Sequence, residues 1–129
     1  MTAIDANVLV RYLVQDDPAQ AALANDFMAE LTSAKPGYVS VIVLVELYWV
    51  LHRAYKFERS RILDLMNMLV HADELEVEVS PTVTRAIQRA QAGADFADAV
   101  ILEQGMRAGC TRMVTFDRRA APMQEAVLL

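Results

Sequence analysis

The order of apolar segments along the chain predicts an α/β fold, a three-layer α/β/α sandwich with a mostly parallel central sheet. Short strand-like segments alternate with longer helical ones, which is typical of parallel strands joined by helices. Hydrophobic residues make up 55% of the 129 residues and the mean hydropathy is +0.23. A sheet buried on both faces would account for much of that excess. The length fits one domain, residues 1–129.

Five short segments are expected to form strands. The clearest is Leu75-Glu76-Val77-Glu78-Val79, in which apolar and acidic residues alternate as they do on a half-buried strand. The other expected strands are residues 2–5, 38–40, 112–116 and 126–129.

Helices are expected between these strands. Pro18 suits the first turn of a helix over residues 19–31. Ser40 is placed to cap a helix over residues 41–55, which is apolar almost all round. The other expected helices are residues 7–13, 57–70, 82–91 (opened by Ser80-Pro81) and 95–107.

The composition argues against several classes of protein. No apolar run approaches the roughly 18 residues that a membrane span requires. The first five residues have no basic region and already include an acid, unlike a signal peptide. The single cysteine, Cys110, has no partner for an internal disulfide, and no Cys/His spacing indicates structural zinc. We therefore expect a cytoplasmic protein without a membrane partner.

The net charge of −5 and the pI of about 4.9 argue against binding nucleic acid by simple phosphate neutralisation. An acidic site that holds divalent cations, however, reverses its own local charge. The low pI therefore does not exclude a metal-dependent nuclease.

Several acids are expected at the carboxyl ends of strands, where α/β folds bind ligands. Asp5 ends the first expected strand, and Asp117 directly follows the expected strand over residues 112–116. Asp95 and Asp98 lie on one face at the start of a helix. Singly, each has an ordinary explanation. Asp5 and Asp117 suit turns, Asp95 suits a helix N-cap, and Asp98 suits the helix dipole. Their coincidence at one edge favours a common site.

Glu46 is the most unusual acid, because it is the only charged residue in the apolar stretch Val41–Leu51. An ionised carboxylate in apolar surroundings costs several kcal/mol unless something compensates it. A buried salt bridge, with Arg53 as one candidate partner, is the ordinary explanation. The alternative is a shared metal site.

Carboxylates that lie close together raise one another's pKa and resist joint ionisation, and a divalent cation removes that conflict. Oxygen ligands without cysteine or histidine suit Mg²⁺, for which Mn²⁺ can substitute, better than zinc.

Taken in order, four motifs resemble the PIN domain, and most closely the VapC-type toxins of bacterial toxin–antitoxin pairs. These motifs are Ile4-Asp5-Ala6-Asn7-Val8-Leu9, Ser40 through Glu46-Leu47, Ala94-Asp95-Phe96-Ala97-Asp98-Ala99-Val100-Ile101 and Val114-Thr115-Phe116-Asp117. The resemblance covers essentially the whole chain. It implies an α/β/α sandwich and a Mg²⁺-dependent endoribonuclease that cleaves RNA with metal-activated water. It also implies a homodimer that a small cognate antitoxin inhibits.

The resemblance also implies roles for individual residues. The family's catalytic, metal-binding acidic quartet corresponds to Asp5, Glu46, Asp98 and Asp117. Asn7 and Thr115 match supporting polar positions. Asp95 matches an extra acid of this subgroup, and the division of roles between Asp95 and Asp98 stays open. Arg118-Arg119 stands near a position where the family often has an aromatic residue.

Two other functions are considered. A catalytically inactive PIN-like interaction module would keep the fold, but the complete quartet argues against it. An aspartate-based phosphatase is a poorer fit, because Asn7 stands where a second aspartate is needed and the only lysines are Lys35 and Lys56. The apolar excess has two possible destinations, the core or an interface with a second copy or an antitoxin.

Overall fold

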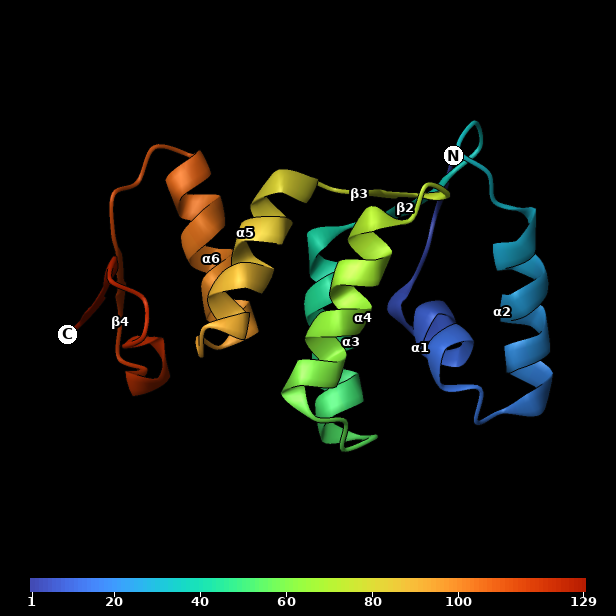
Figure 1. The fold of residues 1–129 in the computed structure, drawn as a ribbon, viewed down its shortest axis with the longest axis horizontal. Helices are drawn as coiled ribbons and strands as arrows, with labels where there is room; N and C mark the ends of the chain where they lie inside the picture. Colours follow the sequence, from blue (N-terminus) through green and yellow to red (C-terminus); the bar gives the residue numbers. More distant parts are fainter. The chain divides into compact units, whose positions relative to one another are not determined.

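The computed structural model describes residues 1–129, and the chain divides into two compact units. Unit 1 is Met1–Glu78 and unit 2 is Val79–Leu129. Figure 1 shows the order of the elements along the chain.

Unit 1 is a parallel sheet with four helices. Its strands pair in the order β1-β2-β3, and both pairings are parallel. The strands are β1 (Thr2–Ala3), β2 (Gly37–Val39) and β3 (Leu75–Val77). The helices are α1 (Ala6–Val14), α2 (Pro18–Glu30), α3 (Val41–Arg53) and α4 (Arg59–His71).

The core of unit 1 lies where the helices pack together. Helix α1 contacts α2 and α3, α3 contacts α4, and α4 contacts β3. The side chains buried there come from every third or fourth helical position, as an amphipathic helix requires. The fully buried ones on the helices are Leu9, Leu44, Leu47, Leu51, Ile62 and Met66, and Val39 of β2 is fully buried as well.

Unit 2 is a helical pair followed by a two-stranded parallel sheet. Helices α5 (Ser80–Gln91) and α6 (Phe96–Arg107) pack closely on each other. Strands β4 (Met113–Thr115) and β5 (Ala126–Leu128) pair in parallel, and a short 3₁₀ helix, η1 (Arg118–Ala120), follows β4.

The predicted α/β class is confirmed, because all five expected strands are present and every pairing is parallel. The strands are shorter than expected for local reasons. Asp5 leaves β1 to cap α1, so Asn7 lies inside the helix. Val79 adopts a left-handed conformation at φ 42°, which ends the extended backbone of β3.

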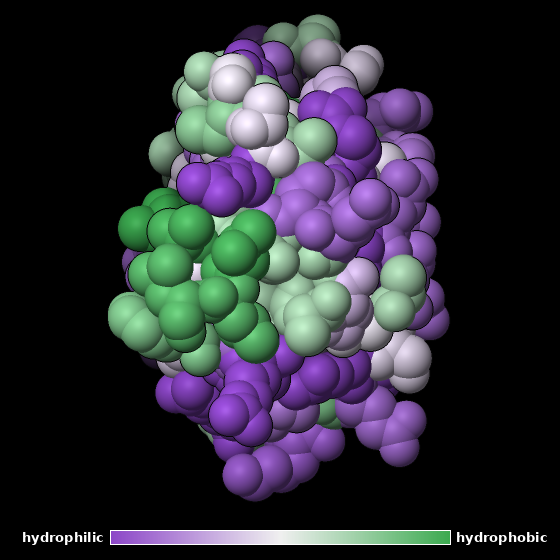
Figure 2. Space-filling model, turned by 90° about the vertical axis from the view of Figure 1, so that its left-hand side faces the viewer, coloured by the Kyte–Doolittle hydropathy of each residue, from purple (hydrophilic) through white to green (hydrophobic).

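The apolar excess is divided between core and surface. Tyr48, Met28 and Leu63 are buried, whereas Leu23 and Trp49 are 70% and 43% exposed. In unit 2, β4 and β5 also present exposed apolar side chains, and Figure 2 shows an apolar area bordered by hydrophilic residues on the side where β4 lies. No helix of the structure is both long and apolar enough to cross a membrane.

A buried ion-pair network holds unit 2 together. Glu103 of α6, only 3% exposed, accepts hydrogen bonds from Arg85 Nε at 3.0 Å and Arg89 Nε at 2.6 Å. Arg89 also donates from Nη2 to Glu125, just before β5, at 2.5 Å. Its hydrogen bonds hold the pKa of the Glu125 carboxyl below its usual range. Arg89 therefore ties α5, α6 and the start of β5 together.

The Arg89→Met substitution is expected to lower the free energy of unfolding by about 3 kcal/mol, because it leaves buried Glu103 short of its best partner. Arg85→Met is the matched control. The Arg85 side chain is 52% exposed and Glu103 keeps Arg89, so a loss below about 1 kcal/mol is expected. Urea denaturation of both variants measures the difference, and equal losses would contradict this account.

Candidate functional site

Asp5 is fixed at the start of α1 by the helix itself. Asp5 is the N-cap residue with an extended backbone, and its Oδ1 accepts a hydrogen bond from the N–H of Ala6, the first helical residue, at 2.8 Å. The residue is exposed. The cap therefore holds one carboxylate oxygen and leaves Oδ2 without a partner in the structure.

Glu46 is exposed, which corrects the expectation that it lies in apolar surroundings on a helix buried all round. Helix α3 buries one face only, and the helical period places Ile42, Glu46 and Trp49 together on the exposed face. The suggested salt bridge to Arg53 is also absent. The guanidinium of Arg53 instead lies 3.8 Å from the centre of the Trp49 ring.

One pocket of unit 1, of about 350 Å³, contains three of the predicted site residues. Asp5 and Asn7 line it from the start of α1, and Glu46 lines it from α3. Arg11 and Tyr55 line it as well. We call this cavity the acidic pocket. Asp5 and Glu46, which are 41 positions apart in the chain, thus line the same pocket.

A polar network at the acidic pocket was missed in the sequence. The Tyr55 hydroxyl donates to Asp16 Oδ2 at 2.8 Å and accepts from Arg11 Nη1 at 3.0 Å. Arg11 also pairs with Asp16 at 3.2 Å. The hydrogen bond from Tyr55, assisted by Arg11, holds the pKa of Asp16 below its usual value. No local sequence motif predicts the contact between Tyr55 and Asp16, which are 39 positions apart.

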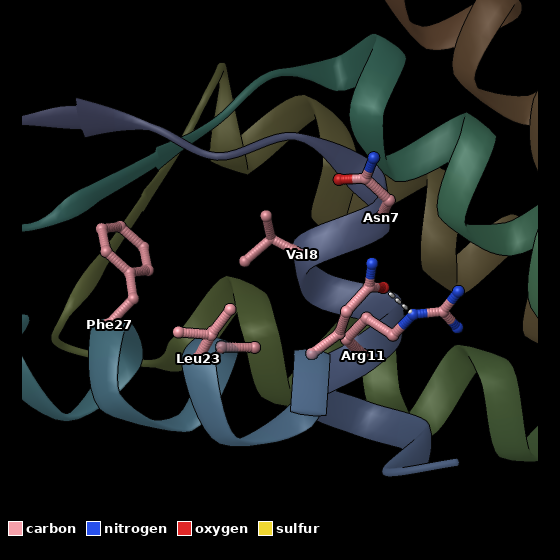
Figure 3. Close-up of a pocket in the computed structure, with 7 residues that line it drawn as sticks. Asn7, Val8, Arg11, Leu23 and Phe27 are labelled. Carbon is pink, nitrogen blue, oxygen red and sulfur yellow. Dashed lines mark hydrogen bonds between the residues drawn. The ribbon is translucent and has the colours of Figure 1, made fainter. Parts of the chain in front are cut away.

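A second pocket of unit 1, of about 300 Å³, lies between α1 and α2 and is mainly apolar (Figure 3). Val8, Leu23 and Phe27 line it. Arg11 reaches across to Gln20, whose Oε1 accepts from Nε at 2.6 Å, and its guanidinium points away from Leu23 and Phe27. Arg11 therefore borders both pockets with one side chain.

In unit 2, the start of α6 brings two acids together. Asp95 is the N-cap, as its sequence position allowed, and its Oδ2 accepts from the Asp98 N–H at 3.2 Å. The Oδ2 atom of Asp98 is buried and has no hydrogen-bond partner. Burial, reinforced by the charges of Asp95 and Asp117, raises the pKa of the Asp98 carboxyl.

Asp117 is held by its own neighbours. Its carboxylate accepts from the Arg119 backbone N–H at 2.9 Å and from the Arg119 guanidinium at 2.7 to 3.1 Å. These hydrogen bonds lower the pKa of Asp117. The Asp117 N–H donates to Thr115 Oγ1 at 3.0 Å, so Thr115 fixes the turn that follows β4.

The seven predicted site residues therefore fall into two groups. Asp5, Asn7 and Glu46 share the acidic pocket of unit 1. The other four lie in unit 2, where the charges of Asp95 and Asp117 act on Asp98. These four residues are Asp95, Asp98, Thr115 and Asp117. Within the structure, no three Asp, Glu, His or Cys side chains gather closely enough to enclose a metal ion.

The PIN domain family model matches residues 2–125, nearly the whole chain. The chain belongs to the PIN domain family. A curated relative, the VapC ribonuclease of Aquifex aeolicus (strain VF5), is 23% identical over 120 residues, which are 92% of this chain and 89% of that protein. The PIN resemblance of the four motifs is thus confirmed.

The chemistry of Asp98 in this PIN domain suits it as one carboxylate ligand of a divalent cation, and the structure gathers no set of three acids around it. The buried Asp98 Oδ2 lacks any donor, and Asp95 and Asp117 add negative charge around it. Arg119, the cation that acts on Asp98, is paired with Asp117. An oxygen ligand set of this kind matches the preference of Mg²⁺ or Mn²⁺.

In EDTA at neutral pH, the Asp98→Asn variant is expected to melt at a higher temperature than the wild type. A carboxyl whose pKa is raised by folding favours the folded state at low pH, and that contribution is lost as the pH rises through the folded pKa. Added Mg²⁺ should raise the melting temperature of the wild type and leave Asp98→Asn almost unchanged.

Asp26→Asn is the control for this experiment, because Asp26 is an exposed acid on α2. It should melt like the wild type in EDTA and keep the full response to Mg²⁺. A destabilised Asp98→Asn in EDTA, with the response to Mg²⁺ intact, would contradict the interpretation of Asp98. Calorimetric melting curves provide the measurement.

Proposed function

We propose that the chain is a Mg²⁺-dependent endoribonuclease that acts as the toxin of a toxin–antitoxin pair in the cytoplasm. The observation that carries the proposal is the buried, partnerless Oδ2 of Asp98 beside two further acids. A bound cation would satisfy that oxygen and balance the negative charge around it. Membership of the PIN family and the VapC ribonuclease relative support nuclease chemistry at such a cation.

In this proposal, Asp5 and Asp98 are the main metal ligands. Glu46 binds the ion or orients the attacking water, and Asp117 holds a second ion or its waters. When bound, Mg²⁺ lowers the pKa of water and stabilises negative charge on the phosphate.

Two supporting side chains position the acids by accepting hydrogen bonds from the acids' backbone N–H groups. Asp95 uses one carboxylate oxygen to cap α6, and this hydrogen bond fixes the Asp98 backbone. We therefore assign Asp98 as a ligand and Asp95 as the residue that positions it. Thr115 holds the Asp117 N–H in the same manner, and Asn7 presents an amide to the acidic pocket.

Asp5→Asn and Asp98→Asn are expected to reduce Mg²⁺-dependent cleavage of structured RNA by about 10²-fold or more while the fold stays intact. Asp95→Asn should lose much less, because asparagine is also a good N-cap. Cleavage is measured on gels after EDTA treatment and addition of Mg²⁺ or Mn²⁺, and circular dichroism verifies folding.

Full activity in both Asp5→Asn and Asp98→Asn would refute the assignment of the quartet. A wild-type protein that never cleaves RNA, once any inhibitory partner is removed, would favour the catalytically inactive interaction module.

We further propose that a small cognate antitoxin inhibits the chain and that the chain is a homodimer. The exposed apolar residues Leu23 and Trp49 and the pocket between α1 and α2 support an additional protein partner.

Purification of the native chain under mild conditions is expected to recover a small co-encoded protein together with suppressed RNase activity. Removal of that protein by denaturation and refolding should restore Mg²⁺-dependent cleavage, and light scattering of the remaining chain should give the mass of a dimer. A monomer with unrestrained activity and no bound protein would contradict both assignments.

A further inference from the structure

The end of α3, its connection to α4 and the first turn of α4 form a cationic segment in an otherwise acidic protein. Residues 53–61 contain four of the twelve lysine and arginine residues and only one acid, Glu58. All four cations are exposed and none forms an ion pair. We call residues 53–61 the cationic loop, and its cations are Arg53, Lys56, Arg59 and Arg61.

Aromatic rings alternate with the cations of this loop. Arg53 lies 3.8 Å from the centre of the Trp49 ring, and Arg61 lies 3.9 Å from the centre of the Phe57 ring. A guanidinium that stacks on a ring by its face keeps its N–H donors directed outward in its own plane. The stacking therefore orders both guanidinium groups while leaving donors free for an anion.

The cationic loop is continuous with the acidic pocket through Tyr55. Tyr55 lies in the loop and lines the pocket together with Asp5 and Glu46. Its ring is 6.3 Å from that of Phe57, edge to face. The next residue, Lys56, has φ 59°, a conformation that is uncommon for a residue other than glycine and marks a sharp turn.

We propose that the cationic loop binds the single-stranded part of an RNA substrate and leads it to the acidic pocket. This inference rests on the proposed nuclease function. Guanidinium and lysine groups would contact phosphates, and the aromatic and guanidinium planes would stack with unpaired bases. A purely acidic protein partner would use the charges but would leave the stacking planes and the path to the pocket unexplained.

The test measures binding separately from cleavage. The full chain carrying Glu46→Gln, in EDTA, is titrated with a fluorescent single-stranded RNA of mixed sequence between 50 and 200 mM KCl. In this background, Lys56→Gln/Arg59→Gln removes two exposed charges that form no ion pair in the structure. Arg107→Gln/Arg112→Gln removes two exposed charges of unit 2 and is the matched control.

The loop variant is expected to bind RNA about tenfold more weakly at 100 mM KCl. The slope of log K against log salt should fall by about 1.4, near 0.7 for each lost phosphate contact. The control variant should stay within about twofold of the parent. Should Lys56→Gln perturb the turn, as thermal melting would reveal, Arg59→Glu tests the same point at a regular helical position.

Equal affinity for RNA and an equal salt slope in the loop and control variants would overturn the inference. That result is also the one expected if the loop binds an acidic peptide instead of RNA. The two proposals fail separately. A chain with all its acids that cleaves no RNA refutes the nuclease function, whereas unchanged binding by the loop variant refutes only the role of the loop.

Discussion

The repulsion between neighbouring carboxylates is the constraint that orders this molecule's acidic residues. Asp95 places one carboxylate oxygen in the cap of α6, and both oxygens of Asp117 accept hydrogen bonds from Arg119. Asp98 Oδ2 has no such donor, and burial with two neighbouring charges raises its pKa. The negative charge that has no compensating donor is therefore centred on one oxygen, Asp98 Oδ2, where a cation would stabilise it most.

The same hydrogen bonds begin helices and position acids. Asp5 caps α1, Asp95 caps α6, and Asp117 caps the 3₁₀ helix that follows β4. Because a cap fixes the side-chain torsions of its residue, each carboxylate has a defined direction before any ligand arrives. The hydrogen bonds that begin these helices therefore also orient the carboxylates. An Asp-to-Asn substitution removes the charge but keeps a side-chain oxygen that can cap the helix.

Much of this arrangement could be predicted from local patterns, because caps, turns and alternation act over a few residues. The parallel strands, the Ser40 cap and the Asp95 cap belong to this class. The exposure of Glu46 could not be predicted, since a nearly continuous apolar helix does not reveal which face meets solvent. The contact of Tyr55 with Asp16 was equally hidden, because it depends on how α3 packs beside α1.

The low pI first argued against a nucleic-acid substrate, and the distribution of charge removes that objection. An acid-rich site repels phosphates, so a nuclease with a net charge of −5 needs cations placed beside its acids. The cationic loop has a net charge of +3 within nine residues, from four cations and one acid. Because Tyr55 of the loop lines the acidic pocket, cations that attract phosphates lie next to acids that repel them. Over distances near a Debye length of about 8 Å, this local pattern matters more to an approaching RNA strand than the total charge does.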